Sequence, residues 1–336
     1  MVSMLQGRSF LRVSDFSQAE LRNLVDFALH LKDLKARGIP HPYLEGQNLA
    51  LVFNKASTRT RAAFTVAASD LGANLEYFST ADMQLGTKES VADTARVLGR
   101  IFDGIGFRGA AQEDVDILAA EAGVPVWNAL TDLAHPMQMV GDYMTLKEAC
   151  GDLAGLKLVY VGDGRNNVAN SLLLAGLILG VEVAIAAPES LQPNAQVREL
   201  ADRLSETYGT PYQLTEDLHT AVKGADAIYT DVWVSMGEED QLEERINLLQ
   251  PYQVNAQVMA ETGKDTIFMH CLPAYHNGES EKGRALVAKY GEAAFEVTDE
   301  VFQSEAGWHF QQAENRLHST KAILAATNGH LFVPGV

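Results

Sequence analysis

The segment FNKASTRTRAA, residues 53–63, holds residue types suited to binding an anion. Hydroxyl and guanidinium side chains fill five consecutive positions there: Ser57, Thr58, Arg59, Thr60 and Arg61. An apolar run precedes the segment, and a helix-forming run that ends at Gly72 follows it. The unbonded N–H groups of a first helical turn attract negative charge, and arginine matches phosphate oxygens. A plain helix cap is the alternative, but a cap needs one hydroxyl and no arginine, so the pattern favours a phosphate site.

Similar polar clusters follow other strand-like runs. They are Arg108, HPMQ at 135–138, GDGRNN at 162–167, DVWVSMG at 231–237 and HCLP at 270–273. In an open parallel sheet, ligands bind beyond the carboxyl ends of the strands. Polar clusters at so many strand ends therefore predict a ligand-binding function and not merely a soluble α/β protein.

The GDGRNN cluster has a dinucleotide-binding alternative. Gly162 and Gly164 match the start of such a fingerprint, but Asn167 stands where its third glycine belongs. The next predicted strand ends in Ala187 and Pro188 and has Glu189 only beyond it. A nicotinamide site is therefore disfavoured.

Two other interpretations of Cys271 are possible besides a role in substrate binding. A cytosolic cysteine is by default an inert buried thiol. Together with His270 and His276 it could also suggest a metal, but the spacing matches no standard site and a second cysteine pair is absent. We therefore expect no metal.

Three further residues keep simple structural alternatives. His135 precedes a proline and could merely cap a helix. Asp231 could be an ordinary loop acid. Met236, between Ser235 and Gly237, is unusual for a solvated loop and indicates a loop that closes over a ligand.

The elements that must position these residues alternate along the chain. Apolar runs predict strands at 48–53, 74–79, 104–109, 124–129, 156–163, 181–188, 211–217, 226–233 and 266–273. Periodic patterns predict helices at 15–38, 58–72, 89–101, 114–123, 135–150, 166–180, 197–209, 248–263 and 308–329. The order predicts an α/β fold of two domains, each a parallel sheet with helices on both faces, and a boundary near residue 150.

Composition narrows the functional class. The 336 residues suffice for two domains. A net charge of −18 and a pI of about 4.8 argue against nucleic acid or an anionic membrane as the main partner. Two cysteines cannot form a disulfide framework, and neither a signal peptide nor a membrane-spanning run is visible, so we expect a cytoplasmic protein.

The motifs STRTR, HPMQ, GDGRNN, DVWVSMG, HCLPAYH and AENR, in this order and spacing, resemble the ornithine carbamoyltransferases over essentially the whole chain. The resemblance implies a carbamoyl-phosphate-binding domain over 1–150, with the C-terminal helix of about 305–328 packing back on it, and an ornithine-binding domain over 151–304. It implies transfer of the carbamoyl group of carbamoyl phosphate to the δ-amine of L-ornithine, giving L-citrulline and phosphate. It also implies a homotrimer or a multiple of trimers, no cofactor and no metal.

Site residues follow from the same resemblance, position by position. The expected carbamoyl-phosphate set is Ser57, Thr58, Arg59, Thr60, Gln84, Arg108, His135, Gln138, Cys271, Leu272 and Arg316. The expected ornithine set is Asn167, Asp231, Ser235 and Met236. The expected catalytic residues are Arg108, His135, Gln138, Asp231 and Cys271.

Two other functions stay open. A putrescine carbamoyltransferase would not need a site for the α-carboxylate of ornithine, and the SMG motif favours ornithine. A non-catalytic relative would be expected to lose phosphate or amine contacts, and none of those residues is missing here. The sequence does not separate arginine biosynthesis from arginine deiminase catabolism, and the apolar GHLFVPGV tail is a weak candidate for an assembly contact.

Overall fold

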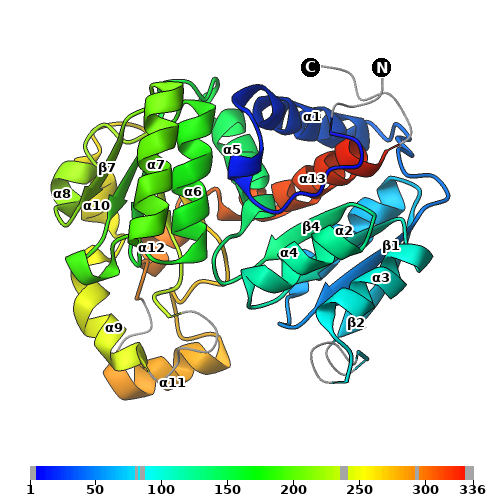
Figure 1. The fold of residues 1–336 in the computed structure, drawn as a ribbon. Coiled ribbons are helices and arrows are strands. Elements are labelled where there is room, and N and C mark those ends of the chain that lie inside the picture. Colours follow the sequence, from blue (N-terminus) through cyan, green and yellow to red (C-terminus); the bar gives the residue numbers. More distant parts are fainter. Residues whose placement is uncertain (1–4, 80–81, 84–87, 235–240, 292–294, 330–336) are drawn as a thin grey trace. The chain divides into compact units, whose positions relative to one another are not determined.

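The computed structural model describes residues 5–79, 82–83, 88–234, 241–291 and 295–329 (Figure 1). The chain forms two compact units: unit 1 is residues 1–144 with 314–336, and unit 2 is residues 145–313. Both changes of unit fall inside long helices, α5 (Pro136–Cys150) and α13 (His309–Asn328). The element pattern predicts a boundary near residue 150, and the family resemblance implies a second one near 305; the units change at 144/145 and at 313/314.

Unit 1 contains a four-stranded parallel sheet in the order β2-β1-β3-β4. Its strands are β1 (Asn48–Phe53), β2 (Asn74–Ser79), β3 (Gly104–Arg108) and β4 (Val126–Leu130). Residues 49–53 of β1 and all of β3 are buried, as expected for inner strands covered on both faces. The predicted α/β class with a parallel sheet is confirmed for this unit.

The helices of unit 1 cover both faces of that sheet. They are η1 (Val13–Asp15), α1 (Gln18–Ala36), α2 (Thr58–Asp70), α3 (Val91–Ile101) and α4 (Gln112–Glu121), with parts of α5 and α13. The chain moves from β1 to β2 in one direction and from β2 to β4 in the other. Because parallel crossovers are right-handed, α2 covers one face and α3 and α4, which pack together, cover the opposite face.

The end of α13 belongs to the core of unit 1. In Figure 1 it lies beside α1, and Lys32 Nζ on α1 donates to Asn315 Oδ1 at 2.9 Å. Trp127 Nε1 on β4 donates to Thr327 Oγ1 at 2.9 Å. Ala322, Ile323, Leu324, Ala325 and Ala326 are buried. This packing fixes the position of Arg316 relative to β4.

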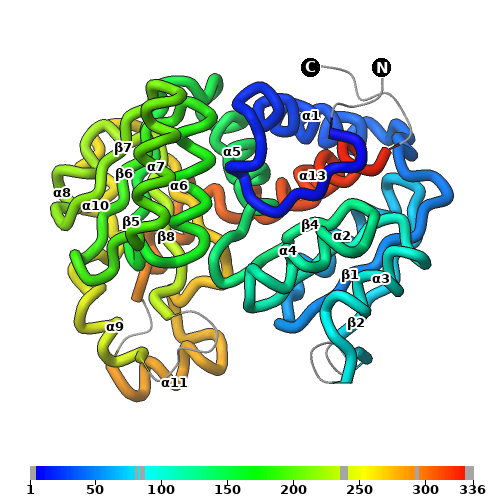
Figure 2. The backbone as a smooth tube through the Cα atoms, in the orientation of Figure 1, coloured from blue at the N-terminus to red at the C-terminus, as the bar shows by residue number. Residues whose placement is uncertain are grey.

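Unit 2 contains a five-stranded parallel sheet in the order β7-β6-β5-β8-β9, most of which can be followed in Figure 2. Its strands are β5 (Lys157–Val161), β6 (Glu182–Ala186), β7 (Tyr212–Thr215), β8 (Ala227–Thr230) and β9 (Ile267–His270). Helices α6 (Asn167–Leu179) and α7 (Ala195–Tyr208) pack together on one face. The remaining helical segments are η2 (Glu189–Leu191), α8 (Leu218–Ala221), α9 (Leu242–Leu249), η4 (Gln250–Tyr252), α10 (Ala256–Glu261), α11 (Glu281–Tyr290) and α12 (Asp299–Phe302).

Within the described residues, all nine predicted strands are present. One predicted helix is wrong: the range 248–263 instead contains the end of α9, then η4 and α10. Pro251 lacks the N–H that a helix interior needs. Asn255 then starts α10 by accepting a hydrogen bond from Val258 N at 3.1 Å. None of the helices in the described part of the chain has the length and apolar character that a bilayer crossing requires.

Candidate active site

Each sheet reverses its strand order at one place, between β1 and β3 in unit 1 and between β5 and β8 in unit 2. Ligands of open α/β sheets bind beyond the carboxyl ends of the strands at such a reversal. In unit 1 the residues there are 54–60 and Arg108. In unit 2 they are 162–167 and Asp231. Both units therefore carry predicted site residues where the topology favours a ligand.

Ser57 starts α2. Its Oγ accepts a hydrogen bond from Thr60 N at 3.3 Å and donates to Thr60 Oγ1 at 3.0 Å. The capping alternative is therefore part of the structure, but it uses only the serine. Thr58 and Arg59 follow in the first turn and are exposed. Arg61 instead places its guanidinium 3.8 Å from the centroid of the Tyr77 ring.

Arg316 gathers several predicted residues of unit 1. It is buried, and its Nη1 donates to Gln138 Oε1 and lies 3.5 Å from His135 Nε2. Its Nη2 donates to Thr60 Oγ1 at 3.4 Å and to the Ala129 carbonyl at 3.4 Å. Four predicted residues from α2, α13 and the start of α5 thus meet at one guanidinium.

Positive charge surrounds His135. Burial, followed by the charges of Arg316, Arg108 and Arg59, holds the pKa of His135 well below its ordinary value. The imidazole is therefore neutral near pH 7, and one ring nitrogen donates while the other accepts. A bound phosphate would offset the charge of the three arginines.

Asn166 and Asp231 form the corresponding polar contact in unit 2. Asn166 Oδ1 caps α6 by accepting from Val168 N at 2.6 Å, and its Nδ2 donates to Asp231 Oδ2 at 3.0 Å. Asp231 Oδ1 also accepts from Val232 N at 2.9 Å. Burial raises the pKa of Asp231, although His270, Asn166 and Val232 oppose that shift. Asn167, the predicted residue, is the first residue of α6.

A buried ion pair supports the same loop. Arg245 Nη1 of α9 lies 2.7 Å from Asp163 Oδ2, and both side chains are almost fully buried. Asp163 Oδ1 accepts from Arg165 N at 3.0 Å. The pair thus connects α9 to the segment between β5 and α6.

Cys271 and Leu272 lie in a tight turn after β9. Leu272 has a φ of 48°, which is unfavourable for a residue with a Cβ. Its N–H donates to His270 Nδ1 at 2.8 Å, so His270 Nε2 carries the proton that faces Glu296 Oε1 at 3.3 Å. His270 and Glu296 are fully buried and hold this turn.

The turn brings Cys271 next to Asp231. Thr230 of β8 pairs in register with His270 of β9, and Asp231 and Cys271 are the residues that follow each. Neighbouring strands lie about 5 Å apart. An acidic and a thiol side chain therefore leave the sheet side by side.

Comparison with known proteins decides the family. The family profile "Aspartate/ornithine carbamoyltransferase, carbamoyl-P binding domain" matches residues 8–148, and "Aspartate/ornithine carbamoyltransferase, Asp/Orn binding domain" matches residues 154–327. The chain belongs to the aspartate/ornithine carbamoyltransferase family. An ornithine carbamoyltransferase of Streptococcus pyogenes serotype M5 (strain Manfredo) is 58% identical over 337 residues, with full coverage of both chains. A relative from serotype M1 with the same identity and coverage is named "Ornithine carbamoyltransferase, catabolic".

Solved structures of the carbamoyltransferase family have the same fold. The ornithine carbamoyltransferase of Pyrococcus furiosus superposes with a TM-score of 0.89 at 43% identity, covering 99% of this chain and 100% of that one. The anabolic ornithine carbamoyltransferase of Campylobacter jejuni has a TM-score of 0.83 at 35% identity, covering 94% and 97%. These likenesses confirm the predicted fold class and family resemblance.

Sequence reasoning within the carbamoyltransferase family pattern missed several residues. Asn166 could have been identified from the sequence, because asparagine just before a helix is a preferred cap. Arg245 and Glu296 could not, since each acts through a partner distant in the sequence. Three predicted residues, Gln84, Ser235 and Met236, lie outside the described residues. Among the residues that are described, no group of three or more His, Cys, Asp and Glu side chains is arranged to hold a metal ion.

Proposed function

We propose that this chain is an ornithine carbamoyltransferase, which transfers the carbamoyl group of carbamoyl phosphate to the δ-amine of L-ornithine and releases L-citrulline and phosphate. The full-length identity of 58% to ornithine carbamoyltransferases is the observation that carries the proposal. The arginine-rich cluster of unit 1 supports it, because the chemistry requires a phosphate site beside hydrogen-bond donors.

Carbamoyl phosphate is assigned to unit 1. The first turn of α2, Arg59 and Arg108 neutralise the phosphate. Thr60, Arg108 and His135 donate toward the carbonyl oxygen, where negative charge develops when an amine attacks. Arg316 holds Gln138 and approaches His135, so it orders the groups that contact the carbamoyl end. Gln84 is assigned to the phosphate of a neighbouring subunit.

Ornithine is assigned to unit 2, with Asn167, Ser235 and Met236 at its amino-acid end. Its δ-amine must react uncharged, although a free alkylamine is largely protonated near neutral pH. Asp231 and Cys271 accept hydrogen bonds from that amine and orient it, and Leu272 packs against the reacting end. Cys271 forms no covalent intermediate.

The reaction needs no group beyond the two substrates and these side chains. The amine nitrogen forms a bond to the carbamoyl carbon and gives a tetrahedral oxyanion. The oxyanion then collapses and breaks the carbon–oxygen bond to phosphate, which leaves with the electron pair. The departing phosphate takes the amine proton.

Citrulline formation from carbamoyl phosphate, with ornithine and putrescine assayed in parallel, tests the proposal. We expect strong turnover with ornithine alone. A preference for putrescine would keep the carbamoyl-phosphate assignment and overturn the ornithine assignment. Activity with neither acceptor would contradict the proposed reaction and favour a non-catalytic relative.

We further propose that the chain is a cytoplasmic homotrimer or a multiple of trimers that acts in arginine metabolism. Its relatives include proteins named catabolic and a structure named anabolic. Light scattering should give a mass of three times 36.5 kDa, or a multiple of that value. A monomeric mass would contradict the assembly. Deleting the residues after Asn328 without a change in mass would remove the tail as an assembly contact.

A further inference from the structure

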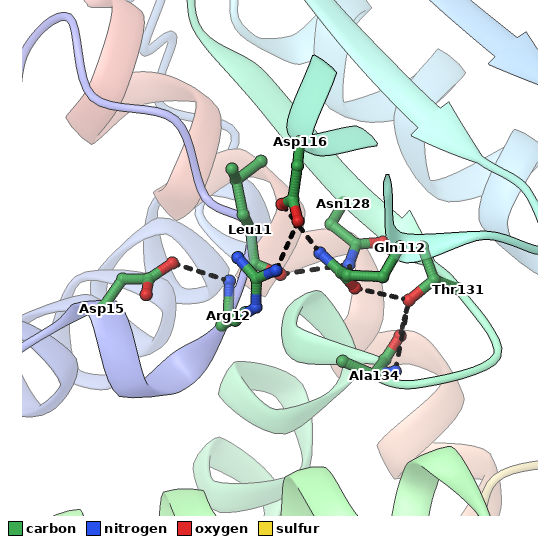
Figure 3. A network of polar contacts seen from close by, with 8 residues as sticks. All are labelled: Leu11, Arg12, Asp15, Gln112, Asp116, Asn128, Thr131 and Ala134. Atoms are coloured by element: carbon green, nitrogen blue, oxygen red, sulfur yellow. Dashed lines mark hydrogen bonds and ion pairs between the residues drawn. The ribbon is translucent and has the colours of Figure 1, made fainter. Parts of the chain in front are cut away.

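A network of polar contacts joins Thr131 and Ala134, in the loop that follows β4, to Gln112, Asn128 and Asp116 (Figure 3). The loop leads to His135. Thr131 follows β4 and is fully buried. Its N–H donates to the Ala134 carbonyl at 2.9 Å, and its Oγ1 accepts from Ala134 N at 3.2 Å. The turn is thus closed at two points, and His135 is the next residue along the chain.

The single hydroxyl proton of Thr131 has a defined use. Since Oγ1 accepts from Ala134 N, its proton is left for another acceptor. Gln112 Oε1 lies 2.7 Å away, whereas the Ala134 carbonyl lies 3.4 Å away. The proton therefore points to Gln112, at the start of α4.

The amide of Gln112 is held in the orientation this contact needs. Its Oε1 also accepts from Asn128 Nδ2 at 3.3 Å, and its Nε2 donates to Asp116 Oδ1 at 3.2 Å. Asp116 Oδ2 in turn lies 2.5 Å from Arg12 Nη2. A reversed amide would set its NH₂ group against the donating Asn128 and its oxygen against a carboxylate. The network therefore fixes the acceptor for Thr131.

We infer that Thr131 and Gln112 are positioning residues for His135. The inference rests on the proposed function, in which His135 donates toward the carbamoyl oxygen. In Figure 3 the side chains of Thr131 and Gln112 contact each other, Ala134, Asn128 and Asp116. These contacts set the turn from which His135 leaves, immediately before α5 begins at Pro136. Misplacing a catalytic group by about 1 Å can cost a hundredfold in rate, so this turn controls turnover.

Two substitutions at position 131 separate positioning from packing. Thr131→Val keeps the shape and removes the hydroxyl, whereas Thr131→Ser keeps the hydroxyl and loses a methyl group. We expect Thr131→Val to lower kcat roughly 10- to 100-fold with little change in KM for ornithine. We expect Thr131→Ser to retain most of kcat. Gln112→Met removes the Oε1 atom that accepts the Thr131 hydroxyl proton, and its kcat should resemble that of Thr131→Val.

Thr266→Val is the matched control. Thr266 is also buried, donates to the Ala225 carbonyl at 2.7 Å, and lies just before β9, at the amino end of that strand. The control should lower thermal stability as Thr131→Val does but leave kcat near that of the unmodified protein.

A second readout keeps the inference separate from the proposed function. Calorimetry of carbamoyl phosphate should show about fivefold weaker binding to Thr131→Val, which loses the hydrogen bonds from Ala134 N and to Gln112 Oε1, and near-normal binding to Thr131→Ser. An unmodified protein without turnover would overturn the proposed function, and the calorimetric comparison would still judge the positioning. Folded Thr131→Val and Gln112→Met with unchanged kcat and affinity would overturn the inference. So would a Thr131→Ser variant as impaired as Thr131→Val.

Discussion

At the scale of single residues, the arginines around His135 have two effects. Together with burial, which is the larger cause, they hold the pKa of His135 well below its ordinary value, so that the ring stays neutral and keeps one acceptor nitrogen. They also supply the charge that a phosphate needs. A bound phosphate would reduce the net positive charge near the imidazole. The three arginines therefore favour a bound anion and disfavour a positively charged imidazole ring.

Arg108 tests this arrangement. It ends β3 and is only 9% exposed, and its charge acts on His135. Arg108→Ala should lower kcat/KM for carbamoyl phosphate roughly 10²- to 10³-fold, the usual cost of losing one oxyanion donor. Steady-state assays of citrulline formation give this ratio.

Arg61→Ala is the matched control for Arg108→Ala. Arg61 lies in the same predicted phosphate-binding segment, residues 57–61, but its guanidinium packs on the ring of Tyr77. We expect its removal to leave turnover within a few-fold of the unmodified protein. Turnover by Arg108→Ala close to that of the Arg61 control would contradict the role assigned to Arg108.

At the scale of elements, the start of α2 must both begin a helix and bind an anion. Ser57→Ala removes the cap on Thr60 N and should cost about 1 kcal/mol in the free energy of unfolding. Ser57→Asp keeps a good capping side chain but adds a negative charge where we assign the phosphate. Urea unfolding should therefore find Asp near the unmodified protein, while the KM for carbamoyl phosphate rises strongly. Equal KM values for Ser57→Asp and the unmodified protein would place the phosphate elsewhere.

Elements were predictable where one physical signal dominates. The strands are short apolar runs because a parallel sheet is buried on both faces. The start of α2 was predictable because serine is a preferred helix cap, and Ser57 caps this helix. Helices α9 and α11 were missed because they are short: at eight and ten residues, each offers only about two to three turns in which a helical period could be recognised. The break at Pro251 was visible in the sequence and outweighed by the apolar residues around it.

The residues of the candidate site likewise fall into those that the sequence predicted and those that it did not. Local patterns predicted the phosphate segment and the strand ends, and the family resemblance supplied Arg316 in α13. The partners that hold the site were not predictable: Thr131 needs Gln112, Asp163 needs Arg245, and each pair joins distant segments. Such contacts depend on how elements pack, which a single sequence does not encode in any local window.

At the scale of the whole molecule, acid stability depends on buried histidines. Burial lowers the pKa of His309 to about 4 and that of His318 to about 3. A histidine of the unfolded chain titrates near 6.5. Below that pH these two histidines bind protons in the unfolded chain but stay unprotonated in the folded chain until the pH approaches their lowered pKa values. Each such group therefore contributes stability above pH 6.5 that is lost as the pH falls toward the folded pKa.

His309 offers the sharpest test. Its ring stacks on Phe302 with centroids 3.9 Å apart, and neither ring nitrogen has a hydrogen-bond partner among the described residues. His309→Phe keeps the ring stack and removes the titrating group. The variant should lose stability less steeply on acidification, by up to about 1.4 kcal/mol per pH unit between pH 6.5 and about 4.

Urea unfolding at several pH values, compared between the two proteins, measures this difference because all other titrating groups cancel. At pH 8 His309 is neutral in both the folded and the unfolded chain. The free energies of unfolding of the two proteins should therefore differ there only by the change in packing. If the two stability curves run parallel from pH 8 to pH 4.5, His309 titrates alike in the folded and unfolded chains. The buried stack would then not contribute to acid sensitivity, and the loss of stability would have to come from the other buried histidines.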